Sequence, residues 1–372
     1  MILYLRKYRL KLLLIVFSVY NIILKNDFLH LFLHEIIINE NIKEQIINLN
    51  KYYELCNDGI LINQTIFQKY LIPKISIISS VYNGEKYILR FLRSIQNQFF
   101  TDIEIIFIDD FSDDNTIKII EHYQKEDKRI FLIKQNKKRG TLQSRNIGAL
   151  KAKGEYLIFP DIDDILSNNI LKECFKTAMQ YNCDLIRFII YMKNQKDINQ
   201  IFFFYNKFIN QPKLSTFVFY SLGFLRENDF NISNKFIKRI LFIKTLNNIN
   251  KFYLNKNMIY FEDGFINYAL HRNANSLYIM KKIGYFYIQN NESVTNNKNR
   301  TLEIQCFLLF LNFVFENSKN NEFEKNMSIH LLKEYLINLS TKNNFMNILK
   351  YLINISKSYF LLNRFKRIVF DF

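Results

Sequence analysis

One stretch decides the fold of this 372-residue chain: Tyr156-Leu157-Ile158-Phe159-Pro160-Asp161-Ile162-Asp163-Asp164. Its first four residues are apolar and predict a short buried strand, and three carboxylates follow closely. Carboxylates at the end of a buried strand are costly unless a cation lies between them. Asp161 and Asp163 can converge on one Mg²⁺ or Mn²⁺ ion, because these ions prefer oxygen ligands. An acidic turn that begins the next helix is the alternative interpretation.

Upstream of this stretch, strand-like and helix-like segments alternate with short connections. Runs rich in β-branched residues predict strands at Ile75–Val81, Ile103–Ile108 and Ile130–Lys134, and helical spacing of apolar residues predicts a helix after each of them. Such alternation implies right-handed crossovers and a mostly parallel sheet with helices on both faces. We therefore expect an α/β, Rossmann-like fold.

Polar segments coincide with the carboxyl ends of these predicted strands. Tyr82-Asn83-Gly84 follows the first strand, Asp109-Asp110 follows the second, and the acidic run at Asp161 follows the fourth. Ligands bind beyond this edge in open parallel sheets, so the sequence predicts a ligand site there. The glycine-rich dinucleotide fingerprint and the phosphate loop are both absent from the sequence. A bound phosphate would therefore be held by a metal and by basic side chains; Arg139 and Arg145 are candidates, and solvated helix-surface arginines are an equal alternative.

The formal net charge is +17, from 51 Lys and Arg against 34 Asp and Glu. The basic residues are spread along a chain rich in Asn, Ile, Phe and Tyr, which indicates a composition bias rather than a patch for nucleic acid. We therefore expect no nucleic-acid partner. The four cysteines have neither metal-ligand spacing nor the density of a disulfide framework.

Several ordered motifs resemble those of family-2 glycosyltransferases, which are inverting nucleotide-sugar enzymes with an A-type glycosyltransferase fold. The similar segments, in chain order, are Ile77–Asn83, Ile106–Asp114, Ser144–Gly148, Gly154–Asp164, Asn234–Arg239, Phe261–Asp263, Tyr285–Tyr287 and Asn291–Thr295. The chain also departs from the family pattern, with Ser80 in place of proline, Phe111 in place of glycine, Pro160 and Ile162 beside the acidic residues, and Ile288 in place of a basic residue. None of the family's carboxylates is lost.

The resemblance implies a nucleotide-diphosphate donor and a divalent metal, Mn²⁺ or Mg²⁺. Asp163 would make the most direct metal contact, Asp161 would contact the metal or the ribose, and Asp164 would orient nearby groups. A metal on the diphosphate would stabilise the leaving group as a Lewis acid.

The resemblance also implies roles around the donor's base. Asp110, and secondarily Asp109, would accept a hydrogen bond from the base. Tyr82 would pack beside the base, with Asn83 next to it in the same turn. For Tyr82, a plain packing tyrosine at the end of a strand is the alternative.

The catalytic base is implied by the later motif Glu262-Asp263. Asp263 would take the proton from the acceptor hydroxyl, and Glu262 would orient the base or bind the acceptor. From the residues alone, this pair could equally be an acidic start to the helix predicted from Phe265 to Arg272, and the two interpretations are compatible.

The chain divides into four predicted regions. These are a candidate membrane anchor at 1–27, a stem or lead-in at 28–72, the catalytic domain at 73–298 and a helical extension at 299–372. Basic residues precede the apolar run Leu12–Leu24, and no small-residue cleavage site follows it. An uncleaved anchor with a cytosolic amino terminus and a buried first helix fit this pattern equally well. The first places the protein in a membrane, in the Golgi or endoplasmic reticulum of a eukaryote, and the second leaves it cytoplasmic or peripheral.

The leading hypothesis is a metal-dependent inverting glycosyltransferase that uses a nucleotide sugar, with a UDP-sugar favoured. Its acceptor would be a hydroxyl of a glycan, a lipid or a protein. A catalytically silent nucleotide-sugar-binding protein is the first alternative, although the retention of both Asp163 and Asp263 argues against it. A basic nucleic-acid-binding protein is the second, supported by net charge alone.

Overall fold

The structure is a computed structural model, and it describes residues 40–57, 72–192, 207–210, 231–249, 251–254, 260–288 and 300–317. The predicted anchor at Leu12–Leu24 and the closing motif at Asn291–Thr295 lie outside these ranges and stay predictions. Among the described residues, no helix has both the length and the apolar character needed to cross a membrane.

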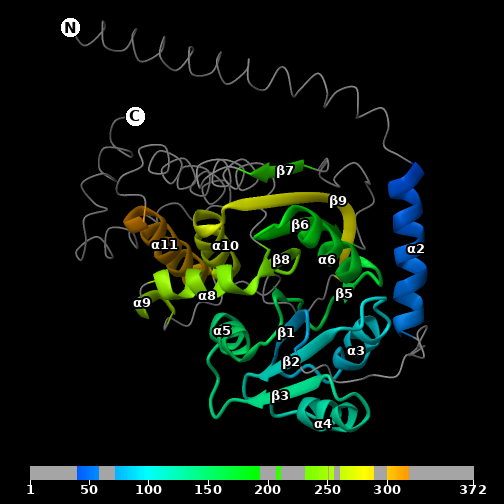
Figure 1. Ribbon diagram of the computed structural model, residues 1–372. Helices are drawn as coiled ribbons and strands as arrows, with labels where there is room; N and C mark the ends of the chain where they lie inside the picture. Colours follow the sequence, from blue (N-terminus) through cyan, green and yellow to red (C-terminus); the bar gives the residue numbers. More distant parts are fainter. Residues whose placement is uncertain are drawn as a thin grey trace, which may run out of the picture.

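The first half of the central sheet is parallel and contains the predicted strands (Figure 1). Its strands are β1 (Ile75–Val81), β2 (Ile103–Asp109), β3 (Ile130–Lys134) and β4 (Tyr156–Ile158). Strand β1 lies in the middle and pairs in parallel with both β2 and β4, while β3 pairs in parallel with β2. The carboxyl ends of β1, β2 and β4 therefore point to one edge, as the sequence predicts.

The second half of the sheet mixes directions. Its strands are β5 (Ile165–Leu166), β6 (Leu185–Met192), β7 (Lys207–Asn210), β8 (Lys235–Lys238) and β9 (Ser276–Tyr287). The order across the whole sheet is β3-β2-β1-β4-β8-β6-β9-β5, and β7 pairs with β9. Strand β8 runs antiparallel to both β4 and β6, and so it joins the two halves.

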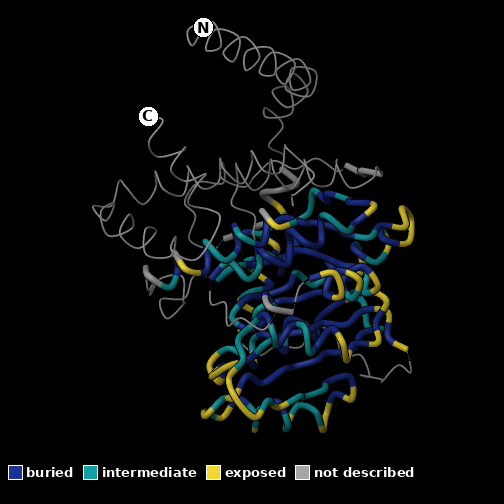
Figure 2. The backbone as a smooth tube through the Cα atoms, turned by 90° about the vertical axis from the view of Figure 1, so that its left-hand side faces the viewer, coloured by how far each residue is buried: buried dark blue, intermediate teal, exposed yellow. Residues whose placement is uncertain are grey.

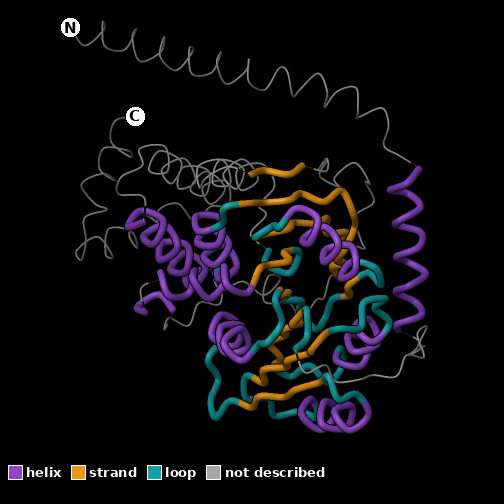
Figure 3. The backbone as a smooth tube through the Cα atoms, in the orientation of Figure 1, coloured by secondary structure: helices purple, strands orange, loops and turns teal. Residues whose placement is uncertain are grey.

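Helices cover both faces of the sheet (Figures 1 and 3). The helices are α2 (Glu40–Asn57), α3 (Ile88–Gln96), α4 (Thr116–Glu126), α5 (Thr141–Lys151), α6 (Ile170–Tyr181), α8 (Arg239–Asn248), α9 (Lys251–Leu254), α10 (Glu262–Asn273) and α11 (Arg300–Asn317). Successive strand residues serve opposite faces: Ile77 packs in the core with α3, α4 and α6, and Ile78 packs in the core with α5, α8, α10 and α11. Strands β1 and β2 are accordingly buried along nearly their whole length. Buried residues run through the middle of the molecule and exposed ones lie at its edges (Figure 2), and the predicted α/β fold is confirmed.

Helix α2, from the predicted lead-in, packs against β9 and α3. Leu49, Tyr52 and Cys56 are buried in a third core cluster with residues of β5, β6 and β9. The Tyr52 hydroxyl donates to the main-chain oxygen of Ser94 at 2.9 Å. Helix α2 is therefore held to the central sheet and to α3 by both apolar and polar contacts.

Gly154, just before β4, is expected to tolerate no side chain. A Cβ there would lie 2.5 Å from the main-chain nitrogen of Ser76 and 2.8 Å from the carbonyl carbon of Ile75, and these main-chain atoms of β1 cannot rotate away. We expect Gly154→Ala to lower the free energy of unfolding by about 1–3 kcal/mol, measured by urea denaturation. Lys153→Ala, at the neighbouring exposed position, is the control, and equal stability of the two variants would contradict this account.

Candidate active site

The turn after β1 is tied to the loop after β2 by main-chain and side-chain hydrogen bonds. The main-chain nitrogen of Asn83 donates to Ser112 Oγ at 3.0 Å, and Asn83 Oδ1 accepts from the main-chain nitrogen of Asp113 at 3.0 Å. The main-chain nitrogen of Gly84 donates to Thr116 Oγ1 at 2.7 Å. Asn83 has a φ of 48°, a left-handed conformation that Asn adopts more readily than most residues. Asn83 therefore shapes the edge of the sheet by joining its two loops.

The carboxylates of Asp109 and Asp110 bind main-chain amides of neighbouring loops. Asp110 Oδ1 accepts from the nitrogen of Arg139 at 2.7 Å, and Asp110 Oδ2 accepts from the nitrogen of Gly140 at 2.8 Å. Asp109 Oδ2 accepts from the nitrogen of Phe111 at 3.2 Å. These contacts fix the loop that begins α5. Asp109 Oδ1 is buried without a hydrogen-bond partner among the described residues, so one acceptor remains at this edge.

Phe111 stands where the family that the motifs resemble usually has glycine. Its φ is 72°, in the left-handed region that a bulky side chain rarely occupies, and its ring is exposed. The strained conformation persists because Asp109 accepts hydrogen bonds from the nitrogens of both Phe111 and Ser112. The departure from the family pattern therefore leaves the backbone turn in place and adds an aromatic ring to the surface.

Tyr82 and Arg139 lie at the exposed rim of this edge. The Tyr82 ring is exposed, and the Lys138 ammonium lies 3.4 Å from its centroid, a cation–π contact. Arg139 is half-buried, and its guanidinium donates to Asn136 Oδ1 at 3.4 Å. Both predicted donor-binding side chains can therefore be reached from solvent.

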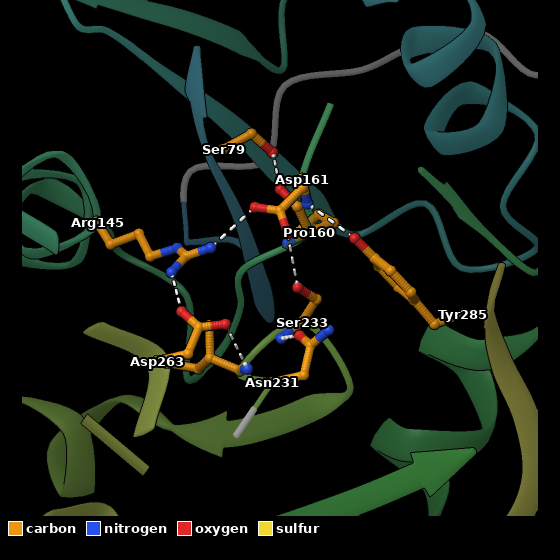
Figure 4. Close-up of polar contacts among 9 residues, drawn as sticks. Ser79, Arg145, Pro160, Asp161, Asn231, Ser233, Asp263 and Tyr285 are labelled. Carbon is orange, nitrogen blue, oxygen red and sulfur yellow. Dashed lines mark hydrogen bonds and ion pairs between the residues drawn. The ribbon is translucent and has the colours of Figure 1, made fainter. Parts of the chain in front are cut away.

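Arg145 lies at the centre of the site and joins two carboxylates (Figure 4). Its Nη2 donates to Asp161 Oδ1 at 2.8 Å, and its Nη1 donates to Asp263 Oδ1. Arg145 is only 5% exposed, so it is not the solvated surface arginine of the alternative interpretation. Two carboxylates from distant parts of the chain thus share one buried guanidinium, whose planar fork suits this geometry.

Asp161 is held from three more directions. Ser233 Oγ donates to Asp161 Oδ2 at 3.1 Å, and the main-chain nitrogen of Asp161 donates to the Tyr285 hydroxyl at 3.0 Å. The neighbouring carbonyl oxygen of Pro160 accepts from Ser79 Oγ on β1 at 2.9 Å. The acidic run therefore has a fixed start, set by β1, β9 and the segment before β8 (Figure 4).

Asp163 and Asp164 carry carboxyl groups whose pKa values are raised. Burial, and then the charge of Asp161, raises the pKa of Asp163 to about 6. Burial raises the pKa of Asp164 as well, with the charges of Asp163 and Asp161 adding to the effect. Asp164 Oδ1 accepts from the main-chain nitrogen of Ile288 at 2.8 Å. Among the described residues, no side chain donates to the Asp163 carboxylate.

Glu262 and Asp263 begin α10, directly after Phe261, which has a left-handed φ of 62°. Asp263 Oδ2 accepts from the main-chain nitrogen of Ile232 at 3.1 Å. Burial raises the pKa of Asp263, and the Arg145 charge opposes this rise. Burial, together with the Asp263 charge, raises the pKa of Glu262 to about 8. The Arg145 charge therefore favours the ionised form of Asp263, while burial and the Asp263 charge favour the protonated form of Glu262.

The carboxylate oxygens of the acidic run fit a divalent cation that also binds the oxygens of a substrate. Asp161 and Asp163 offer only oxygen, and the charge of Asp161 opposes the ionisation of Asp163, so a cation between them would relieve the repulsion. The described ranges contain no group of three or more His, Cys, Asp or Glu side chains that could hold a metal ion. A metal held by Asp161 and Asp163 would have further positions open for phosphate oxygens, as Mg²⁺ has in phosphate sites.

Sequence reasoning did not assign roles to Ser233, Tyr285 and Arg90. Ser233 directly precedes the Asn234 motif, and Tyr285 opens another motif, so position next to family motifs was the available signal. Arg90 Nη2 donates to the main-chain oxygen of Asp163 at 2.6 Å, and no motif marks it. The contacts of all three residues depend on tertiary structure.

Comparison with known proteins finds a family match in the part of the chain that holds the acidic run. Residues 76–231 match the family model described as Glycosyl transferase family 2. Glycosyltransferase GlyG of Streptococcus pneumoniae is 33% identical over 131 residues, which cover 35% of this chain and 43% of that protein. GalNAc(5)-diNAcBac-PP-undecaprenol beta-1,3-glucosyltransferase of Campylobacter jejuni is 38% identical over 107 residues, which cover 28% of this chain and 35% of that protein. The chain thus spans less than half the length of these curated relatives.

The fold is similar to that of a solved structure. The crystal structure of S. aureus TarS 1-349 in complex with UDP superimposes with a TM-score of 0.56 at 20% identity, covering 73% of this chain and 74% of that one. This likeness supports the α/β fold predicted from the motifs. The predicted resemblance to family-2 glycosyltransferases is confirmed by the family match.

Proposed function

We propose, because residues 76–231 match the family model described as Glycosyl transferase family 2, that this chain transfers a sugar from a nucleotide-diphosphate donor to an acceptor hydroxyl with inversion. A UDP-sugar is the favoured donor, and TarS, a protein of similar fold, is known in complex with UDP. The acceptor would be a glycan, a lipid or a protein. A glycosyltransferase of Campylobacter that is named for an undecaprenol-linked glycan is among the relatives.

One observation carries the proposal: Arg145 contacts Asp161 and Asp263 with the two arms of its guanidinium. Asp161 belongs to the acidic run at the carboxyl end of β4, where the donor diphosphate would bind. Asp263 belongs to α10, and it has the family position of the base. A displacement needs these two groups at a fixed separation on opposite sides of the reacting carbon. The shared arginine supplies that fixed separation.

The residues of the chain would divide the reaction between them. Asp161 and Asp163 would hold Mn²⁺ or Mg²⁺, a kind of ion commonly used in this family, and the ion would act as a Lewis acid on the leaving diphosphate. Asp263 would accept the proton of the acceptor hydroxyl as that hydroxyl attacks. Arg145 would favour the ionised form of Asp263 before the attack, since its charge opposes the rise in the pKa of Asp263 that burial causes. Tyr82 would pack beside the base of the nucleotide, and Asp109 would offer its unpartnered oxygen.

A donor screen tests the proposal. Purified protein is incubated with UDP-, GDP- and other nucleotide sugars, with Mn²⁺ or with EDTA, and release of the nucleoside diphosphate is measured. We expect metal-dependent hydrolysis of one donor class, and UDP-sugars first. Binding without release or transfer to any acceptor would favour the catalytically silent alternative. Failure of every nucleotide sugar to bind would reject the proposal.

Asp163→Ala is expected to abolish metal-dependent nucleotide binding. The variant removes the carboxylate to which no described side chain donates, and with it one of two protein ligands of the ion. Calorimetric titration with UDP should show an affinity gain from Mn²⁺ in the wild type and none in the variant. Asp113→Ala, on the exposed rim of the same edge, is the control. An undiminished effect of Mn²⁺ on Asp163→Ala would remove Asp163 as a metal ligand.

A further inference from the structure

Helix α2 lies outside the family match, yet one of its side chains reaches toward the acidic run. The Tyr53 ring stacks on the Phe286 ring of β9, with centroids 5.3 Å apart and an interplanar angle of 14°. The guanidinium carbon of Arg90, on α3, lies 5.8 Å from the centroid of the same Tyr53 ring. One aromatic side chain of α2 therefore contacts both α3 and β9.

Arg90 continues this connection to the site. Its Nη2 donates to the main-chain oxygen of Asp163 at 2.6 Å, a charge-assisted hydrogen bond. Its guanidinium also lies 6.0 Å from the ring centroid of Tyr87, at the start of its own helix. Two tyrosine rings thus fix the direction of a guanidinium whose hydrogen bond ends in the acidic run.

Strand β9 holds the same run from the other side. The Tyr285 hydroxyl accepts from the nitrogen of Asp161, and the nitrogen of Ile288 donates to Asp164 Oδ1. Phe286 lies between Tyr285 and Ile288 in the chain and pairs with Ile165, which directly follows the acidic run. The stacking of Tyr53 on Phe286 therefore supports the part of β9 from which the run is held.

We propose that Tyr53 and Arg90 are positioning residues, through which α2 braces the acidic run in the shape that binds the metal and the donor diphosphate. The inference rests on the proposed function of that run. It predicts that the shape of 159–166 depends on a helix outside the family domain. Its physical basis is that the neighbouring carboxylates of the acidic run repel one another. Other residues must therefore hold the main chain of the run, because this repulsion alone would move the carboxylates apart.

Hydrogen–deuterium exchange of the peptide 159–166 in the full chain tests the brace without requiring activity. We expect Tyr53→Ala and Arg90→Ala to speed this exchange about tenfold, which is the effect of losing one cation–π contact or charge-assisted hydrogen bond. Tyr53→Phe keeps both ring contacts and should retain the wild-type exchange. In calorimetric titrations, Tyr53→Ala and Arg90→Ala should also weaken UDP binding with Mn²⁺ about tenfold and leave binding without Mn²⁺ nearly unchanged.

Arg93→Ala is the matched control. Arg93 lies one turn along α3, with its guanidinium 5.4 Å from the Tyr123 ring and a hydrogen bond to Gln96, and among the described residues it makes no hydrogen bond to the acidic run. It should lower thermal stability as Arg90→Ala does and leave the exchange of 159–166 as in the wild type. The brace is overturned if Arg90→Ala and Tyr53→Ala change that exchange no more than Arg93→Ala does. A wild type that binds no nucleotide would instead reject the proposed function, while the exchange comparison would still decide the brace.

Discussion

Asp263→Asn is expected to lower kcat by about 10²–10⁴-fold, the usual contribution of a general base, while nucleotide-sugar binding stays within a few-fold of the wild type. The amide keeps the shape of the carboxylate and can still accept from the main-chain nitrogen of Ile232. It cannot take a proton from the acceptor. Initial rates with a competent donor and acceptor, together with calorimetric binding of the donor, measure the two effects separately.

Glu262→Gln is the control for Asp263→Asn. Burial and the neighbouring charge of Asp263 raise the pKa of Glu262 to about 8, so this side chain is mainly protonated at neutral pH, and glutamine resembles that form. We expect its kcat at pH 7 to fall far less than that of Asp263→Asn. A reversal, with Glu262→Gln inactive and Asp263→Asn active, would assign the base to Glu262.

The parallel half of the fold could be predicted from the sequence because its signals are local. Strands β1 and β3 begin and end where the β-branched runs begin and end, at Ile75–Val81 and Ile130–Lys134. The helix predicted after β1 is α3, which begins only at Ile88. The residues between β1 and α3 form a turn, because the nitrogen of Gly84 donates to Thr116 Oγ1 at the start of α4. That partner is distant in sequence, so no local pattern could reveal it.

The candidate site could be predicted as a set of residues but not as a set of contacts. The resemblance selects Asp161, Asp163 and Asp263, and the structure brings Asp161 and Asp263 to one arginine. Arg145 and Asp263 are 118 positions apart, and sequence position alone left Arg145 between a phosphate ligand and a surface side chain. The carboxylate of Asp110 likewise has main-chain donors that only the folded loop reveals. Whether a carboxylate oxygen is available to a ligand therefore depends on the hydrogen bonds that the folded chain already makes to it.

Arg145→Ala is expected to abolish transfer and to lower the free energy of unfolding by about 2–3 kcal/mol. Removing one partner of a buried ion pair typically costs about 3–5 kcal/mol, because the other charge stays buried without compensation. The side chain of Asp161 is 38% exposed, so solvent screens its interaction with Arg145. We therefore expect a smaller loss of stability than for a fully buried pair. Lys151→Ala, at an exposed position of the same helix, is the control for stability in urea denaturation. Unchanged stability and turnover would show that the bridge does not form.

Arg145→Lys separates charge from geometry at this bridge. A lysine keeps the positive charge, but its single ammonium cannot present two parallel donors to Asp161 and Asp263 as the guanidinium does. We expect it to recover part of the lost stability and little of the lost kcat. Recovery of the wild-type kcat would show that the site needs only a cation there.

The double variant Arg145→Ala/Asp263→Asn tests whether the cost of Arg145→Ala comes from an uncompensated charge. Without the guanidinium of Arg145, the negative charges of Asp263 and Asp161 repel each other with no cation between them. Neutralising Asp263 should relieve that repulsion. We therefore expect the double variant to be more stable than Arg145→Ala alone, by about 1–2 kcal/mol. If the two single effects simply add, Arg145 stabilises the fold through packing, and the fixed separation between the donor site and the base must have another source.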